Sequence, residues 1–274
     1  MRVFDLHCDT PYKYLLGETP IVNGDSIKSF SSYKACTALW IDDRDPKPFV
    51  LYKRLLSAAK KVQFDHLLTL EGFCFANGPD TVDLLKKDGI CAATLTWNYN
   101  NRLAGGCLDD GILTALGKSI IRRMNECGIM LDLSHINERS FFPALEQAEK
   151  VYISHGNLKS ICNHPRNITN EQAKALAGRG GIIGICLYPD FLGADVFEKV
   201  YENIVTAEDL GLKTALGSDF DGAIMHPKLN SPEKLYDLRD FLAKKGFSNY
   251  MLEDFFYKNA ESLFIGLYKS VTVI

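Results

Sequence analysis

The sequence has no long hydrophobic run and no excess of charge of either sign. Its 274 residues carry 31 lysines and arginines against 34 aspartates and glutamates, a formal net charge of −3. No apolar stretch approaches the roughly 20 residues that span a bilayer, so we expect no membrane partner. The near balance of charge gives no electrostatic reason to expect a nucleic acid partner. No charged region followed by an apolar segment precedes Arg2, so we also expect no secretory signal.

The eight cysteines form no Cys-x-x-Cys pair and are spread through the chain. Several, such as Cys91 and Cys186, lie inside apolar runs, where a thiol behaves as a small buried hydrophobic group. This usage is typical of reduced thiols, and it argues against a disulfide framework or a thiolate zinc site. We therefore predict a cytoplasmic protein.

What the sequence does have is a regular alternation of short apolar, β-branched runs with longer segments of helical period. The predicted strands are residues 2–8, 34–41, 66–71, 91–97, 129–134, 151–154, 182–188 and 213–219. The predicted helices are residues 46–62, 79–88, 112–127, 138–149, 169–177, 195–210, 231–245 and 249–266. Eight such units predict an α/β fold, a (β/α)8 TIM barrel whose parallel sheet is covered by helices. No linker or repeat divides the chain, so we expect residues 1–274 to form a single domain.

A doubly wound open sheet is the competing fold. It usually has fewer strands and often a glycine-rich phosphate turn after the first strand, where this chain reads His7-Cys8-Asp9-Thr10-Pro11. Residues 10–32, which contain Pro11, Gly17 and Pro20, are predicted to be an irregular insertion that lines the mouth of the barrel.

Metal-ligand side chains stand at the carboxyl ends of five predicted strands. His7 and Asp9 alternate with Cys8, so both should project to one face of the first strand while Cys8 turns toward the helices. The equivalent residues on later strands are Glu71, His135, His155 and Asp219. A barrel gathers its chemistry at this end of the sheet, so we expect the six side chains to converge. A lone capping aspartate or rim histidine has an ordinary structural explanation, but six at equivalent positions are hard to assign to capping.

A buried cluster of carboxylates and neutral imidazoles would suffer repulsion and desolvation without a cation. Mixed histidine and carboxylate ligands suit zinc or another divalent transition metal, whereas oxygen ligands alone suit magnesium or calcium. His7, Asp9, Glu71, His135 and His155 are too many for one open tetrahedral ion. They match two ions that share a bridging carboxylate and a hydroxide.

The segments FDLHCDT, TLEGF, LDLSH, ISHGN, HPRNIT and GSDFDG follow one another between residues 4 and 222. In this order and spacing they resemble the membrane (renal) dipeptidase family, a branch of the amidohydrolase superfamily of metal-dependent barrels. The resemblance implies two Zn²⁺ ions per chain. It implies that His7 and Asp9 bind one ion, that His135 and His155 bind the other, and that Glu71 bridges them.

The resemblance also implies roles for residues beyond the metal ligands. Asp219 would be the acid/base carboxylate, and Arg166 would bind the carboxylate of the substrate. Tyr188, at the end of the seventh predicted strand, stands where the family has a tyrosine near the same carboxylate. Mammalian members carry a histidine where this chain has Trp97, and we expect Asn98 to supply a neutral hydrogen-bond donor to the substrate instead.

These expectations combine into a zinc-dependent dipeptidase that hydrolyses small dipeptides through a metal-bridging hydroxide, with C-terminal D-residues among the candidate substrates. The alternative is another amidohydrolase-type hydrolase, such as a deaminase, a lactonase or a phosphoesterase, because one barrel hosts many chemistries. A metal-binding barrel without enzymatic activity is a third reading. A small dipeptide is the expected partner, and the oligomeric state is left open, with a homodimer as one candidate.

Overall fold

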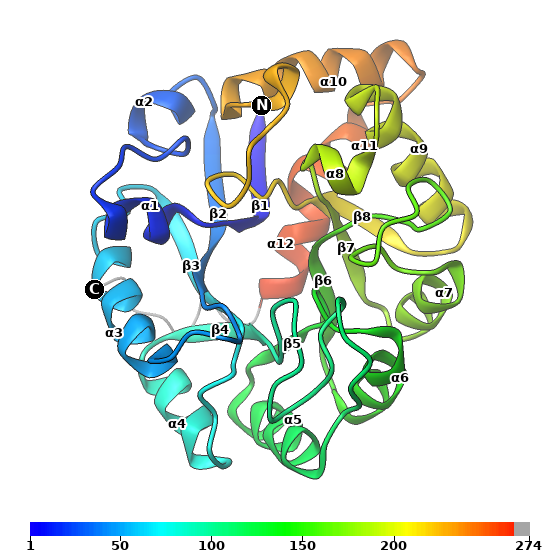
Figure 1. Cartoon of the computed structure of the whole chain (residues 1–274). Coiled ribbons are helices and arrows are strands. Elements are labelled where there is room, and N and C mark those ends of the chain that lie inside the picture. Colours follow the sequence, from blue (N-terminus) through cyan, green and yellow to red (C-terminus); the bar gives the residue numbers. More distant parts are fainter. Residues whose placement is uncertain (266–274) are drawn as a thin grey trace.

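The computed structural model describes residues 1–265, in which eight strands form one parallel sheet ordered from β1 to β8. The strands are β1 (Arg2–Cys8), β2 (Ser32–Trp40), β3 (Asp65–Glu71), β4 (Ile90–Thr94), β5 (Met130–Asp132), β6 (Val151–Gly156), β7 (Ile182–Ile185) and β8 (Lys213–Leu216). After β8 the chain returns beside β1, where the Asp9 N–H donates to the Phe220 carbonyl at 2.9 Å and the Asp219 N–H donates to the His7 carbonyl at 3.1 Å. The predicted TIM-like α/β barrel is confirmed, and Figure 1 shows its ring of strands inside a ring of helices.

The helices follow the predicted alternation, with ends that differ by a few residues. They are α1 (Thr10–Leu16), α2 (Gly24–Ile27), α3 (Pro48–Ala59), α4 (Asp80–Lys87), α5 (Ala115–Cys127), α6 (Glu138–Gln147), α7 (Asn170–Gly178), α8 (Pro189–Leu192), α9 (Val196–Asp209), α10 (Leu235–Lys244), α11 (Asn249–Glu253) and α12 (Asn259–Phe264). Two 3-10 turns, η1 (Pro227–Leu229) and η2 (Pro232–Lys234), precede α10, and a π-helical turn, η3 (Asp254–Lys258), joins α11 to α12. The last predicted helix was expected to end at residue 266, and the predicted domain at residue 274. Residues 266–274 lie outside the described residues. No helix within residues 1–265 is long and apolar enough to cross a membrane.

The prediction that residues 10–32 are irregular is wrong, because this segment contains α1 and α2. Pro11 lies in the first turn of α1, where its missing N–H removes no helical hydrogen bond and its fixed φ suits a helix. Gly17 ends α1 in the left-handed region at φ 75°. Asn23 caps α2 by accepting hydrogen bonds from the N–H groups of Asp25 and Ser26. The prolines and glycines of this segment therefore mark helix ends rather than a loop.

The inside of the barrel is filled with apolar side chains at the amino end of the strands. Every strand contributes to one buried cluster, which consists of Phe4, Leu6, Cys36, Leu67, Cys91, Ala92, Met130, Tyr152, Ile182 and Ala215 with Tyr257, Ala260 and Phe264. The Phe264 ring of α12 lies 5.5 Å from the ring of Phe4 and 6.1 Å from that of Tyr152. Figure 1 accordingly shows α12 against the ring of strands. Because this end is plugged, chemistry is confined to the carboxyl end.

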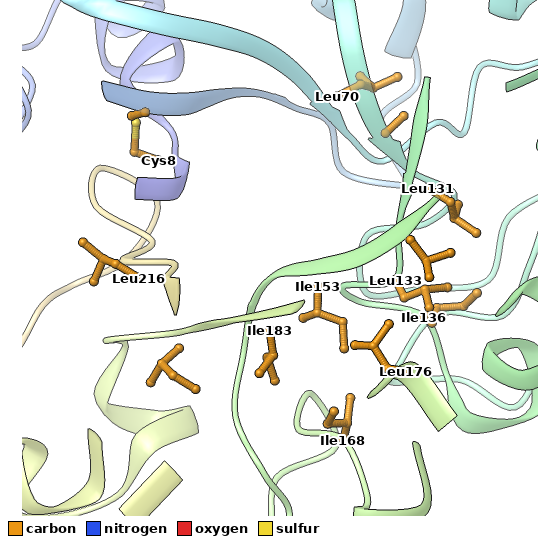
Figure 2. Packing of buried hydrophobic residues seen from close by; sticks show 14 of the residues in the cluster. Cys8, Leu70, Leu131, Leu133, Ile136, Ile153, Ile168, Leu176, Ile183 and Leu216 are labelled. Carbon is orange, nitrogen blue, oxygen red and sulfur yellow. The ribbon is translucent and has the colours of Figure 1, made fainter. Parts of the chain in front are cut away.

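A second, larger cluster fills the space between the sheet and the helices. Figure 2 shows part of it, in which Leu131, Ile153, Ile183 and Leu216 of four successive strands lie with Leu176 of α7. Near-continuous burial of the strands on both faces explains their unbroken apolar runs.

Two strands carry an extra residue just where they deliver a histidine. Between Asp5 and Cys8, β1 advances three residues while β2 advances two, and between Ile153 and Gly156, β6 advances three while β7 advances two. Such bulges change which side chains point inward. Phe4 and Leu6 belong to the interior cluster, yet His7 joins the site beyond it, because the bulge in β1 interrupts the alternation.

Candidate metal centre

Six buried side chains meet at the carboxyl end of the barrel. Each offers a ligand atom to one or more of three overlapping groups, within which the atoms lie no more than 4.8 Å apart. The groups are His7, Asp9 and Glu71; Glu71, His135 and His155; and His7, His155 and Asp219. The structure thus brings together the six residues, which come from β1, β3, β6 and the segments that follow β1, β5 and β8.

The two carboxylate oxygens of Glu71 face different histidines. Its Oε1 lies 2.5 Å from Nε2 of His135 and 3.6 Å from Nε2 of His155, whereas its Oε2 lies 3.3 Å from Nε2 of His7. His7 Nε2 is also 3.4 Å from Oδ2 of Asp9. Glu71 therefore stands between two sets of ligand atoms, which is the geometry of a carboxylate that bridges two cations.

Backbone conformation aims two of these side chains. His135 and Asp219 have left-handed φ values of 66° and 65°, a region that residues other than glycine rarely adopt. Both follow the carboxyl end of a short strand. Strained residues of this kind concentrate at functional sites, where the surrounding structure holds them in place.

Neighbouring side chains fix the ring orientation of two histidines. Oδ1 of Asn98 lies 2.8 Å from Nδ1 of His135, and Oγ of Ser154 lies 2.8 Å from Nδ1 of His155. When Nδ1 carries the proton and donates it to these oxygens, Nε2 presents its lone pair to the centre. Metal-binding histidines usually have such partners on the second nitrogen.

Burial and charge set the protonation states of the ligands. Burial, assisted by the positive charge of Arg166, lowers the pKa of His135 to about 3, and burial lowers the pKa of His155 well below its usual value. Burial alone would lower the pKa of His7, but the carboxylates of Glu71 and Asp9 outweigh it and hold that pKa well above its usual value. His135 and His155 are therefore neutral at pH 7, the form that binds metal, while a cation at His7 would displace a proton.

The residues at this centre fit divalent cations. Nε2 of His7 and Oδ1 of Asp9 are buried and have no hydrogen-bond partner within the described residues, although buried polar atoms are normally paired. Gly222 keeps the space beside them open, because a Cβ there would come within 2.1 Å of Asp9 Oδ2 and 2.6 Å of Asp219 Oδ1. Three imidazoles with three carboxylates suit zinc or a similar ion.

Asp219 has the surroundings of an acid/base group. Burial raises the pKa of its carboxyl group to about 8, with the negative charges of Asp9 and Glu71 adding to the effect against His7 and Arg166. Its one side-chain hydrogen-bond contact within residues 1–265 is the thiol of Cys186, at 3.8 Å from Oδ2. A carboxyl group that is free of strong partners and titrates near neutral pH can accept and return a proton.

A cavity of about 480 Å³ opens above the centre. Residues of the centre form its floor, and its walls include Tyr12 and Lys13 of α1, so residues 10–32 do line the mouth as predicted. Asn98 and Tyr188 also line it, and the Tyr188 hydroxyl donates to Oδ2 of Asp190 at 2.8 Å.

Arg166 is buried beside this cavity rather than in its lining. Its Nη2 donates to the His155 carbonyl at 2.7 Å, and its guanidinium carbon lies 5.7 Å from the centre of the Phe191 ring, which does line the cavity. Its Nε has no hydrogen-bond partner in the described part of the chain. The positive charge thus lies on the side of the cavity that α8 covers.

Two further buried carboxylates support the candidate ligands. Oδ1 of Asp5 accepts from the N–H groups of His7 and Ser218, and Oδ1 of Asp132 accepts from those of Ser134 and Ser154. Each aspartate ties its own strand to a neighbouring strand beside a ligand histidine. The sequence signal common to both is an aspartate two or three residues before a strand-end histidine.

Comparison with known proteins identifies related chains. A model of the family described as "Membrane dipeptidase (Peptidase family M19)" matches residues 47–263. An uncharacterised protein of the pqqA 5′ region of Klebsiella pneumoniae is 30% identical over 184 residues, which cover 60% of this chain and 67% of that protein. An uncharacterised dipeptidase of Schizosaccharomyces pombe is 29% identical over 235 residues, covering 78% of this chain but only 56% of the yeast protein. The chain therefore spans part of the length of these relatives.

A solved structure shares the fold over almost its whole length. It is a metallopeptidase from Rhodobacter sphaeroides, liganded with a phosphinate mimic of the dipeptide L-Ala-D-Ala. The TM-score is 0.84 at 17% identity, and the match covers 96% of this chain and 98% of the other.

Proposed function

Because this chain belongs to the membrane dipeptidase family, peptidase family M19, we propose that it is a metal-dependent dipeptidase. The proposal depends on how the two carboxylate oxygens of Glu71 are placed. Its Oε1 faces His135 and His155, while its Oε2 faces His7. This placement supports two cations, one held by His7, Asp9 and Glu71 and the other by Glu71, His135 and His155. Zinc is the ion that this donor set favours.

The proposed reaction depends on the bound metal ions and on Asp219. Divalent ions bound at this centre supply Lewis-acid chemistry that polarises a peptide carbonyl and activates water. The C–N bond of the dipeptide breaks, water supplies OH to the acyl carbon, and its proton passes to the departing amine. The carboxylate of Asp219 accepts this proton and delivers it. The side chains of the centre are buried, and five of the six line the cavity through which substrate and water would enter.

The substrate is proposed to be a small dipeptide whose C-terminal carboxylate is drawn toward Arg166. The guanidinium is a permanent positive charge beside the cavity, and Tyr188 lines the same side. A related metallopeptidase is known with a mimic of L-Ala-D-Ala, which supports testing C-terminal D-residues. Oδ1 of Asn98 faces Nδ1 of His135, which leaves its Nδ2 as the proposed hydrogen-bond donor to the substrate. A cytoplasmic location remains a prediction from the sequence.

The first prediction concerns metal dependence. We expect about two zinc ions per chain by elemental analysis, loss of dipeptide hydrolysis on chelation, and its return when zinc is added. A panel of dipeptides with L- and D-residues at the C-terminus is measured beside lactone, amino-heterocycle and phosphate-ester panels. Full activity in metal-free protein would refute the metal role, and turnover of only the other panels would favour a different amidohydrolase-type reaction.

A further inference from the structure

We propose that the cavity contains an aromatic subsite, formed by Tyr12, Trp40 and Trp97, which binds a large apolar or aromatic side chain on the first residue of the dipeptide. The inference rests on the proposed function and narrows its substrate class. It concerns residues of the cavity wall that take no part in binding metal.

The three rings form a continuous row of edge-to-face contacts along one wall. The centres of the Tyr12 and Trp40 rings lie 5.0 Å apart at an interplanar angle of 86°, and those of Trp40 and Trp97 lie 5.1 Å apart at 77°. Edge-to-face pairs of this kind are favourable for aromatic rings. All three residues line the cavity and are only partly buried, so their rings keep uncovered surface toward it. In an aromatic cluster that served only to stabilise the fold, that surface would be covered by protein.

The wall begins next to the metal centre. The ring of Trp97 lies 6.2 Å from the ring of His135. A side chain on the wall therefore belongs to a residue next to the bond that is broken, and not to a distant part of a longer ligand.

The position of Arg166 decides which residue of a dipeptide faces the wall. Arg166 and Phe191 lie on the side formed by β6, β7 and α8, whereas the wall comes from α1, the end of β2 and the segment after β4. These elements lie on opposite sides of the ring of strands in Figure 1. A dipeptide whose C-terminal carboxylate lies toward Arg166 places its first residue toward Trp40 and Trp97.

The segment that carries Trp97 is held in place by a half-buried carboxylate. Oδ2 of Asp43 accepts hydrogen bonds from the N–H groups of Trp97 at 2.8 Å and Tyr99 at 3.1 Å, and its Oδ1 accepts from Asn101 at 2.8 Å. A wall that is fixed before binding loses little entropy when a ligand arrives.

The chemistry of the wall favours apolar side chains over acidic ones. Its surface consists of two indole rings and a phenol ring. Lys13 is the cation of the adjoining rim, and its Nζ is engaged at 2.8 Å by Oε2 of Glu18. An apolar ring or branched chain that leaves water for this surface gains both burial and aromatic contact.

The first arm of the test is a hydrolysis panel of X-Ala dipeptides on the zinc-loaded protein, with Gly, Ala, Leu, Phe, Trp and Glu as X. We expect kcat/KM for Leu, Phe and Trp to exceed that for Gly and Glu by about tenfold or more. Trp40→Ala should lower kcat/KM for Phe-Ala about tenfold more than for Gly-Ala. Tyr250→Ala, which removes an exposed aromatic ring of α11 outside the cavity, should leave the panel unchanged. In a reciprocal panel of Ala-X dipeptides, Trp40→Ala should not change the relative kcat/KM values for different X.

The second arm measures binding without turnover. Trp40 and Trp97 are the only two tryptophans of the sequence, so intrinsic tryptophan fluorescence reports directly on the wall. We expect L-phenylalaninamide to change the emission in a saturable manner at concentrations about tenfold below those that L-alaninamide needs. In Trp40→Ala, the change in Trp97 emission should need an L-phenylalaninamide concentration about tenfold higher than in the wild type.

The two arms separate failure of the subsite from failure of the proposed function. Hydrolysis that is independent of X, or a preference for Glu, would overturn the subsite while the dipeptidase function stands. If no dipeptide is hydrolysed but fluorescence shows the expected preference for L-phenylalaninamide, the proposed function is overturned while the subsite stands. Equal binding of the two amides would also overturn the subsite.

Discussion

Asp219 and Asp221 share a left-handed backbone, with φ values of 65° and 69°, but their carboxylates have different surroundings. The carboxylate of Asp221 accepts from the Thr10 hydroxyl at 2.7 Å and from the Ile21 N–H at 2.6 Å, so it ties the start of the chain to the loop after β8. The carboxylate of Asp219 has one side-chain hydrogen-bond contact among residues 1–265, the Cys186 thiol, and it faces the cavity. Both residues line the cavity, and we propose a chemical role for Asp219 and a structural role for Asp221.

The second prediction follows from this contrast. Asp219→Asn should lower kcat by about 10²- to 10⁴-fold, because the amide cannot accept a proton, while the metal content stays unchanged. Steady-state kinetics and elemental analysis measure the two effects. Asp221→Asn is the matched control, and we expect it to reduce thermal stability much more than kcat. Loss of metal from Asp219→Asn would make this residue a ligand instead, as its proximity to His7 and His155 allows.

The third prediction concerns pH and Asp43. Burial raises the pKa of this carboxyl group to about 6, from an ordinary value of 3.8, despite hydrogen bonds from Asn101, Tyr99 and Trp97. The folded chain therefore holds a proton on Asp43 more tightly than the unfolded chain between about pH 4 and pH 6. Stability from this group is present below that window and is lost as the pH rises through it. The unfolding free energy of the wild type, minus that of Asp43→Asn, should fall by roughly 1–3 kcal/mol from pH 4 to pH 6 and then stay level.

Urea denaturation at several pH values provides this measurement. Taking the difference between the two proteins removes the contributions of other buried carboxyl groups, such as Asp5 and Asp221, whose pKa values burial also raises. A difference that rises with pH would contradict the assigned direction of the Asp43 shift.

The six converging side chains could be predicted from the sequence because each ends or follows an apolar run that is typical of a strand, whereas Arg166 was assigned from the family resemblance. The orientations could not. The left-handed φ of His135 and the pairing of its Nδ1 with Asn98 depend on neighbours far away in the sequence. Asn98 was predicted as a donor to the substrate, but the contact of its amide oxygen with His135 could not be predicted.

Among the elements, β6, β7 and β8 meet so closely that two positions admit no side chain. A Cβ on Gly184 of β7 would lie 1.9 Å from the Ser154 carbonyl oxygen, and one on Gly217, just after β8, would lie 2.0 Å from the same atom. Ser154 precedes His155 and its hydroxyl contacts Nδ1 of that ring. The close approach of these backbones therefore sets the position of a ligand.

The fourth prediction tests this packing. Gly184→Ala should lower the unfolding free energy by about 1–3 kcal/mol or more, because β6 and β7 must separate to admit the methyl group. It should also weaken zinc binding, measured by competition with a chelator. Gly178→Ala is the control, since a Cβ there meets nothing within 4 Å at the exposed end of α7. It should be neutral or slightly stabilising. Equal zinc affinity in the two variants would count against the link from Gly184 to His155.

Strand periodicity predicted the barrel well, but not its bulges or its short helices. The alternation of His7 and Asp9 across Cys8 was read correctly, yet the extra residue in β1 that turns His7 inward leaves no mark in the sequence. In α1 and α8, proline lies in the first turn of the helix. Because proline disrupts the interior of helices, its presence in the sequence indicates a loop, although it is favoured at a helix start.

For the molecule as a whole, stability and chemistry are separated along the barrel axis. Phe264 fills the amino end against Phe4 and Tyr152, while the metal ligands occupy the opposite end. Loops at the carboxyl end can vary without opening this apolar plug.

The fifth prediction follows from the separation. Phe264→Ala should cost about 3–5 kcal/mol of unfolding free energy, because it removes a fully buried ring from the plug. At temperatures where the variant stays folded, its KM for dipeptides and its zinc affinity should match those of the wild type. Chemical denaturation and steady-state kinetics give both values, and a shifted KM would mean that the two ends of the barrel are coupled.

The seam between β1 and β8 joins the earliest and latest strands of the chain. His7 and Asp9 on one side hydrogen-bond through their backbones to Asp219 and Phe220 on the other. During synthesis, the first ligands must therefore wait for more than two hundred later residues before their neighbours exist. A chain that stops before β8 lacks Asp219 and the backbone partners of His7 and Asp9, so we expect it to lack the assembled centre.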